Sequence, residues 1–110
     1  MFPFQIIKFP DFPKTEHKGE TGSAYYQTFE ADGLRIRIVE YSPGYLADHW
    51  CEKGHIVYCL EGTFISELSN GQKFTLSKGM TYLVSDNLSS HRSFSSTGVK
   101  LLIIDGSFLK

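Results

Sequence analysis

Three side chains that can bind a metal ion, His49, Cys51 and His55, lie close together in the stretch DHWCEKGHIVYCLEG, residues 48–62. Imidazole and thiolate groups are the ligands that zinc, copper and ferrous iron prefer in proteins. The spacing alone leaves two interpretations open, a metal site or three polar residues with separate partners, because a lone histidine is more often simply hydrogen-bonded. The choice depends on the secondary structure that carries these residues.

Strand geometry would bring these side chains to one face. On a strand, residues two apart point the same way and lie about 6.6 Å apart, so two side chains can reach one ion. His49 and Cys51 are such a pair, and His55 faces the same interior if it begins the next strand after the Lys53-Gly54 turn. A helix that aligns Cys51 with His55 is disfavoured by Gly54 and the β-branched residues after it. The absence of a C-x-x-C pair argues against a zinc finger.

Turn signals recur along the whole chain and separate segments of about five to eight residues rich in β-branched and aromatic types. Residues 34–41 (LRIRIVEY) and 72–76 (QKFTL) alternate polar and apolar types, as half-buried strands do. Residues 55–60 (HIVYCL) and 100–105 (KLLIID) are nearly continuous apolar runs, which suit strands buried on both faces. We predict an all-β domain of eight or nine short strands, a sandwich, jelly roll or small barrel.

Composition excludes several classes of protein. The chain has 110 residues, enough for one domain, and a net charge of −1 gives no surplus positive charge for a nucleic-acid backbone. No apolar run approaches the roughly 20 residues that a membrane helix needs, and the apolar start lacks a basic leader, so we expect a cytoplasmic protein. Cys51 and Cys59 could form a disulfide, but cytoplasmic thiols usually stay reduced.

The first residues differ from the rest in character. We expect residues 1–21 to form an extended N-terminal arm that packs on the barrel, and residues 22–110 to form the single domain. The arm holds four phenylalanines with little periodicity. It either covers an apolar face of its own barrel or crosses to a second subunit and helps to make a homodimer, because exposed apolar segments often mark interfaces.

The first motif of the cupin family, G-x5-H-x-H-x3,4-E-x6-G, resembles the run from Gly44 through His49, Cys51 and His55 to Gly62. Four residues instead of five follow the first glycine. Cysteine stands at the position of the second histidine, and histidine at that of the glutamate. In the family these three positions bind metal.

The second cupin motif, G-x5-P-x-G-x2-H-x3-N, is matched more loosely by the run that begins at Gly79. Ser85 stands at the proline position, Asn87 at the second glycine, and His91 comes one residue late. Ser95 replaces the closing asparagine. The second motif is therefore degenerate, and His91 is its one candidate ligand.

The likeness covers roughly residues 34–105, and the chain looks most like small single-domain cupins named for an Asp-His-Cys-Trp motif, whose order here is Asp48-His49-Trp50-Cys51. The resemblance implies a jelly-roll double-stranded β-helix with one divalent transition metal in the barrel mouth. The implied ligands are His49, Cys51, His55 and His91. Replacing the usual carboxylate by a thiolate makes the set softer, which favours zinc, iron or nickel over manganese or magnesium.

Two classes of function fit such a site. One is a metal-dependent enzyme, of dioxygenase or isomerase type, that acts on a small organic molecule in the barrel. The other is a non-catalytic module that binds a metabolite or senses redox state through its thiolate. Strand parity places Val57 and Cys59 on the inward face with His55, and Tyr45 on that of His49, so we predict a largely apolar pocket with one phenol. No catalytic residue is assigned.

Overall fold

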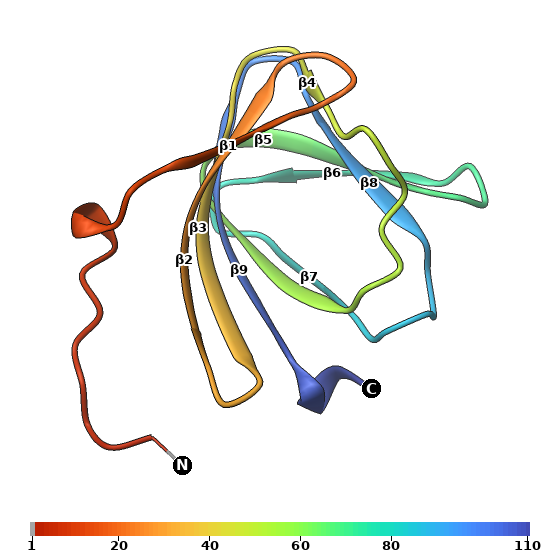
Figure 1. The fold of residues 1–110 in the computed structure, drawn as a ribbon. Helices are drawn as coiled ribbons and strands as arrows, with labels where there is room; N and C mark the ends of the chain where they lie inside the picture. Colours follow the sequence, from red (N-terminus) through yellow and green to blue (C-terminus); the bar gives the residue numbers. More distant parts are fainter. Residues whose placement is uncertain (1) are drawn as a thin grey trace.

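The structure, a computed structural model, describes residues 2–110, and within them the regular elements are nine strands and two short 3-10 turns (Figure 1). The strands are β1 (Thr15–Lys18), β2 (Ser23–Ala31), β3 (Leu34–Tyr41), β4 (Tyr45–Leu46), β5 (His55–Leu68), β6 (Lys73–Ser77), β7 (Thr81–Val84), β8 (His91–Ser95) and β9 (Val99–Gly106). The turns are η1 (Phe9–Asp11) and η2 (Ser107–Leu109). Neither turn, nor any other described segment, is a helix long enough to cross a bilayer.

All strand pairs are antiparallel, and the sheet order is β1-β2-β3-β9-β5-β8-β4. The long strand β5 also pairs with β6 and β7, so it takes part in both halves of the sheet. The sheet curls round on itself into a barrel, open at one end (Figure 1). The predicted all-β, jelly-roll type of fold is confirmed.

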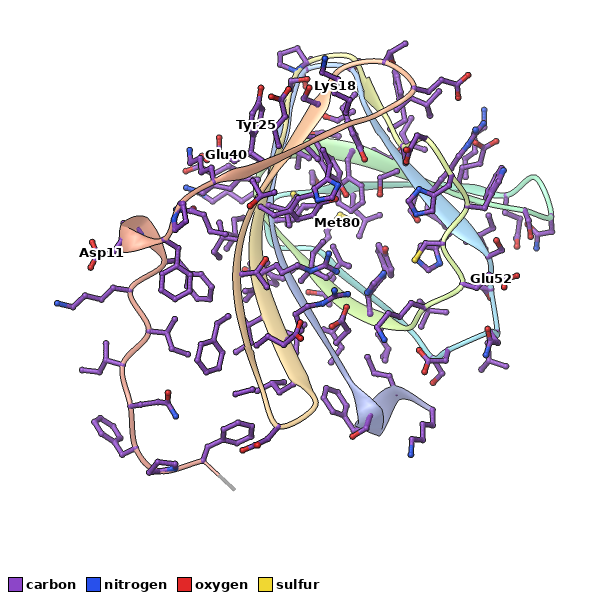
Figure 2. The ribbon with its side chains drawn as sticks, in the orientation of Figure 1. Asp11, Lys18, Tyr25, Glu40, Glu52 and Met80 are labelled. Carbon is purple, nitrogen blue, oxygen red and sulfur yellow. The ribbon has the colours of Figure 1, made fainter. Side chains whose placement is uncertain are left out.

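Burial alternates along the strands of this curled sheet. On β9 every second residue from Val99 to Asp105 is buried and the residues between are only half-buried, and on β5 Tyr58 is 40% exposed. The prediction that residues 55–60 and 100–105 are buried on both faces is therefore wrong. A single curled layer has one inner and one outer face, and within residues 2–110 the arm covers part of the outer face at Gln27 of β2. Tyr25 and Glu40, which pair across β2 and β3, lie on that outer side (Figure 2).

The apolar core fills one part of the barrel interior. Its largest fully buried side chains are Phe64 on β5 and Leu101 on β9. Burying such side chains contributes about 1.5–3 kcal/mol each, before the entropy cost of ordering the chain. The other buried members of the core are Ala24, Val39, Tyr45, Val57, Cys59, Leu76, Val99 and Ile103.

The segment before β1 lies outside the barrel (Figure 1). Gln27 on β2 donates hydrogen bonds from Nε2 to the carbonyl oxygens of Phe9 and Phe12, at 2.7 and 2.9 Å. Phe4, by contrast, is 94% exposed. Residues 15–18 pair with β2 as part of the sheet, and Glu20 and Thr21 form backbone hydrogen bonds with Leu46 of β4. The arm therefore contacts the barrel through η1, β1 and the residues that follow β1.

Candidate metal centre

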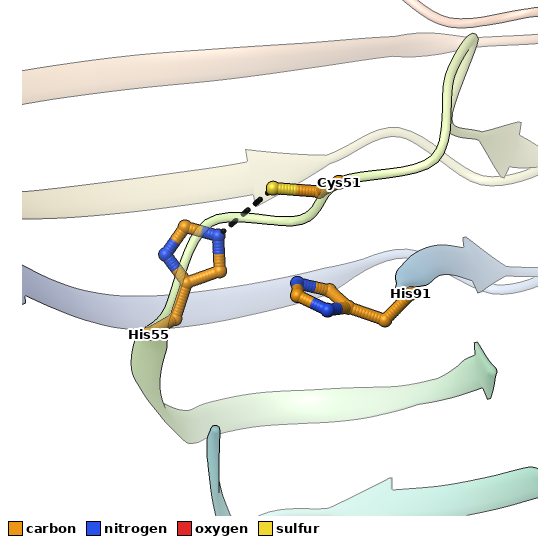
Figure 3. A group of neighbouring side chains, drawn as sticks. All are labelled: Cys51, His55 and His91. Atoms are coloured by element: carbon orange, nitrogen blue, oxygen red, sulfur yellow. Dashed lines mark hydrogen bonds between the residues drawn. The ribbon is translucent and has the colours of Figure 1, made fainter. Parts of the chain in front are cut away.

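Three of the predicted ligands come together at the open end of the barrel. The ligand atoms of Cys51, His55 and His91 all lie within 4.8 Å of one another (Figure 3). His55 is the first residue of β5, and His91 is the first residue of β8. The backbone of Cys51 pairs with that of His91 through two hydrogen bonds of 2.7 and 3.0 Å, which fixes the thiol beside the imidazole.

A close backbone contact sets where His55 enters the barrel. Gly54 packs so tightly that a Cβ there would lie 2.7 Å from the carbonyl oxygen of Val84. Its amide donates a 2.6 Å hydrogen bond to Oδ1 of Asp86. Only glycine allows the chain to pass this close, and the contact positions the start of β5 against the end of β7.

The buried His91 imidazole presents a free nitrogen to the cluster. Its Nδ1 lies 2.8 Å from the carbonyl oxygen of Ser89, so Nδ1 carries the hydrogen and donates it. Nε2 is then the ring nitrogen without a hydrogen-bond partner, although it is buried. Burial lowers the pKa of His91, but its contact with the Cys51 thiolate outweighs burial and raises the pKa. Buried polar atoms rarely stay unpaired, and an unpaired one calls for an explanation such as an ion.

His55 is oriented in the same manner by a carboxylate. Its Nδ1 lies 3.2 Å from Oδ2 of the buried Asp105, and its Nε2 lies 3.4 Å from Sγ of Cys51. Arg35 also donates two hydrogen bonds to Asp105, 3.0 Å from Nε to Oδ1 and 2.8 Å from Nη2 to Oδ2, the oxygen that His55 contacts. A carboxylate that accepts from the outer nitrogen of a histidine is the usual support of a metal-binding imidazole.

The thiol of Cys51 is prepared to act as an anion. The neighbouring imidazole of His55 and, after it, that of His91 lower the pKa of Cys51 to about 5, against the opposing effect of burial. The group is therefore a thiolate at neutral pH, which is the form that binds metal. The outer ring nitrogens of His55 and His91 are held by Asp105 and by the carbonyl oxygen of Ser89. The two inner imidazole nitrogens and the thiolate fit a divalent ion that accepts nitrogen and sulfur ligands.

His49 does not join this group. Its side chain is 74% exposed, and its Nδ1 lies 2.6 Å from Oδ1 of Asp48. The strand that would place residues 49 and 51 on one face is not formed, because β4 ends at Leu46 and the chain bends at residues 48 and 49. His49 nevertheless lines the same cavity as the cluster. Its role as a fourth ligand stays a prediction.

The cavity at this end has a volume of about 420 Å³, and its wall is polar and aromatic. Four tyrosines line it, where the sequence predicted one. The prediction of a largely apolar pocket is wrong, because it considered only the strands next to the motif, and β2, β3 and β7 also supply side chains. Burial raises the pKa of all four phenols, which therefore stay protonated as hydrogen-bond donors. The four tyrosines are Tyr26, Tyr41, Tyr45 and Tyr82.

Sequence reasoning missed Asp105 and did not place the two arginines of β3. Arg35 and Arg37 both reach Asp105, at 2.8 and 3.2 Å from their Nη2 atoms. Val57 and Cys59 do face inward with His55, as predicted, but they belong to the core below the cavity. The sequence did contain a signal for Asp105, which ends the apolar run of residues 100–105. An aspartate at the end of a buried strand is costly to bury without cationic partners, so it predicts nearby arginine or lysine side chains.

The fold and this cluster together define a cupin-type barrel, and solved structures agree. A predicted oxalate decarboxylase from Thermotoga maritima matches with a TM-score of 0.78 at 14% identity, over 93% of this chain and 99% of that one. A cupin-like protein from the same organism matches with a TM-score of 0.74 at 17% identity, over 91% and 84% of the two chains.

Ectoine synthase from P. lautus matches with a TM-score of 0.73 at 16% identity, over 94% of this chain and 78% of that one. No protein-family model matches the sequence, and a search of curated proteins found no significant match. At such low identities these structures share the fold with this chain, and the fold alone. The chain therefore has the cupin fold, while its resemblance to the Asp-His-Cys-Trp group stays a prediction.

Proposed function

We propose that this protein is a metal-dependent enzyme of the cupin type, whose metal is held by Cys51, His55 and His91 at the open end of the barrel. The observation that carries the proposal is the buried Nε2 of His91. It has no partner and lies within 4.8 Å of the ligand atoms of the other two residues (Figure 3). One divalent ion would pair all three atoms at once.

The ligand set favours zinc, iron or nickel, since thiolate and imidazole ligands are softer than the oxygen ligands that magnesium and manganese prefer. When bound, such an ion supplies a Lewis acid or a site where a substrate and dioxygen meet, which are the needs of isomerase and dioxygenase chemistry. Three side chains leave coordination positions open toward the cavity, as catalytic sites require. His49, the predicted fourth ligand, stands at the rim and would have to leave Asp48 to reach the ion.

A second function is favoured by one observation, the low pKa of Cys51 in an open cavity. Hydrogen peroxide could transfer one oxygen atom to this thiolate, giving a sulfenate and water, and the oxidised sulfur would be a poorer ligand. The protein would then be a redox-sensing metal module. Release of metal by stoichiometric peroxide, with no turnover of any small molecule, would favour this function over the enzyme.

The first test is the metal content of protein purified without a histidine tag or chelator, measured by elemental mass spectrometry. We expect near-stoichiometric metal in the parent and its loss in Cys51→Ala and His91→Ala. Cys59→Ala is the matched control, because Cys59 is the other free thiol, is buried in the core and should leave the metal content unchanged. A parent that folds but takes up no zinc, iron or nickel on reconstitution would refute the metal proposal.

We also propose that the N-terminal arm contributes to a homodimer. Within the part of the arm that the structure describes, Phe2, Phe4 and Ile6 are exposed, and exposed apolar segments often mark interfaces. Removing residues 1–12 should convert a dimer to a monomer in size-exclusion chromatography with light scattering. An unchanged oligomer after the deletion would contradict this role.

A further inference from the structure

The cavity carries a charge opposite to that of the whole chain. The chain has a net charge of −1, yet four cationic side chains line the cavity, Arg35, Arg37, Lys53 and Arg92. No carboxylate of the described residues 2–110 is part of its wall. Among the described residues, the thiolate of Cys51 is the one anionic side chain in the wall, and the four cations outnumber it. A concave surface with an excess of one sign concentrates ligands of the opposite sign, and low-dielectric walls strengthen the effect.

Two of the four cations are already paired by carboxylates behind the wall. Arg92 donates from Nε to Glu67 at 2.9 Å, and its guanidinium lies 4.6 Å from the ring centre of Trp50. Arg35 makes a bidentate contact with Asp105. Asp105 also accepts from His55, so little of its capacity remains for a second guanidinium.

Arg37 is therefore left with unmet donors. Its side chain is only 15% exposed, and of its five N–H hydrogens a single one is used on Asp105, from Nη2 at 3.2 Å. The Nε atom is buried and has no hydrogen-bond partner. Its guanidinium carbon lies 5.4 Å from the ring centre of Tyr26, a contact that holds the group in place without satisfying its hydrogens. A buried charged group with unused donors is costly, and Arg37 lines the cavity, so an acceptor bound there would relieve those of its donors that face the cavity.

We infer that the cavity binds a small organic carboxylate whose oxygens accept hydrogen bonds from the guanidinium of Arg37. This inference rests on the proposed function in that the same molecule would be the substrate beside Cys51, His55 and His91. Planar guanidinium and planar carboxylate match each other in shape, which makes such pairs strong and directional. Of the two remaining cations, Lys53 is exposed to solvent and Arg37 is largely buried. One buried guanidinium suits a singly charged carboxylate group better than a phosphate dianion, which needs more cationic partners.

The remaining wall suits the rest of such a molecule. Tyr41 and Tyr45 stack with ring centres 4.2 Å apart and form an aromatic surface, while the tyrosine hydroxyls can donate to polar groups. A volume of about 420 Å³ lies near the lower end of the range typical of small-molecule pockets. The ligand is thus a compact acid.

Isothermal titration calorimetry on the full, metal-loaded protein tests the inference. The probes are benzoate and succinate, their uncharged amides benzamide and succinamide, and inorganic phosphate. We expect at least one carboxylate to bind, its amide to bind at least about tenfold more weakly, and phosphate to bind more weakly than that carboxylate, since a hydrogen bond to a charged group is worth about one factor of ten or more. Failure of both carboxylates to saturate the protein, or tighter binding of phosphate than of either, would overturn the inference.

Variants then assign the binding to Arg37. Arg37→Gln should weaken the carboxylate at least about tenfold, and Lys14→Gln is the matched control, because Lys14 is an exposed cation whose partner is Glu40, outside this cavity. If Arg37→Gln does not fold, Arg37→Lys replaces it and should also weaken binding, since an ammonium lacks the planar pair of donors. Equal affinity in the parent and a folded Arg37 variant would overturn the assignment.

The same titration with Cys51→Ala separates this inference from the metal proposal. Arg37-dependent carboxylate binding that persists in the metal-free variant, or in a parent that takes up no metal, supports the anion site whatever the fate of the metal centre. A parent that binds metal stoichiometrically and no carboxylate overturns the anion site alone.

Discussion

The barrel interior has an apolar half and a polar half, and the same strands build both. The inward residues of β9 run from Val99 through Leu101 and Ile103 to Asp105, so the strand changes from core to site within its length. On the core side the buried groups need only to fill space. On the site side each buried polar group needs a partner. Asp105 has three partners, Arg35, Arg37 and His55.

β3 and β5 show the same change along their length. On β3 the core residue Val39 is followed toward the open end by Arg37 and Arg35, and on β5 the core residue Cys59 is preceded by His55 at the open end. The antiparallel pairings align these ends, so one end of the barrel becomes polar on all three strands at once. The residues that stabilise the fold and the residues of the candidate site therefore lie at different ends of the same strands. If the two halves are independent, a substitution in one half should leave the property of the other half unchanged.

The largest expected effect on stability lies in the apolar half. Phe64→Ala removes one of the largest fully buried side chains and leaves a cavity, so we expect a loss of about 3–5 kcal/mol in the free energy of unfolding. Urea denaturation followed by circular dichroism measures it. Metal content of the folded variant should be unchanged, and loss of metal together with stability would show that the two halves are not independent.

The next effect is smaller and lies in the polar half. Asp105→Asn removes the only charge that Arg35 and Arg37 share, and we expect a loss of about 3 kcal/mol, at the low end for breaking a buried pair because Arg35 is partly exposed to solvent. Urea denaturation again measures it. Glu40→Gln is the control, since the Lys14–Glu40 pair is exposed and should change stability by less than about 1 kcal/mol. A negligible loss in the free energy of unfolding for Asp105→Asn would mean that the polar half contributes little to the stability of the fold.

The same carboxylate predicts how stability depends on pH. Burial alone would raise the pKa of Asp105, but the hydrogen bonds of Arg35 and the charge of Arg37 outweigh burial and hold it below its ordinary value. A carboxylate with a lowered pKa stabilises the fold fully above its unfolded pKa of about 3.9, and that contribution is lost as pH falls from there through the folded pKa. The difference in unfolding free energy between parent and Asp105→Asn should therefore be constant from pH 5 to 7 and narrow below about pH 4. A difference that widens toward acid pH would contradict the assigned charge state.

Local sequence pattern was enough for most of the fold. The alternation in residues 34–41 and 72–76 predicted strands that became β3 and β6, and the apolar runs predicted the cores of β5 and β9. These patterns succeed because side chains on a strand alternate between its two faces regardless of what the strand pairs with. The likeness to two cupin motifs added His91, which lies far along the chain from Cys51.

The parts that sequence did not predict depend on pairing between distant segments. The facing of Arg35 follows from the register that puts it opposite Asp105 on β9, and nothing near Arg35 in the sequence specifies that register. The bend that turns His49 outward likewise follows from where β4 stops pairing with β8, at Leu46. Spacing of two residues therefore implied a shared face that the backbone does not provide.

The smallest expected effect is that of His49 on metal affinity. It tests whether the metal centre extends beyond Cys51, His55 and His91. His49 is exposed and bound to Asp48, and an exposed pair of this kind is cheap to break, so His49 can turn inward to a metal but gains little net affinity by doing so. His49→Ala should weaken metal binding by about tenfold, equivalent to about 1.4 kcal/mol, whereas Cys51→Ala should abolish it. Competition with a chromophoric chelator measures both affinities.

Asp48→Asn provides the matched variant for this comparison. It removes the charge that holds His49 outward and keeps the side chain's size, so it should tighten metal binding slightly if His49 is a fourth ligand. If His49→Ala loses metal as completely as Cys51→Ala, His49 belongs to the centre on equal terms with the three clustered residues. If both His49→Ala and Asp48→Asn leave the affinity unchanged, the metal centre ends at Cys51, His55 and His91, and the bend at residues 48 and 49 marks its outer limit.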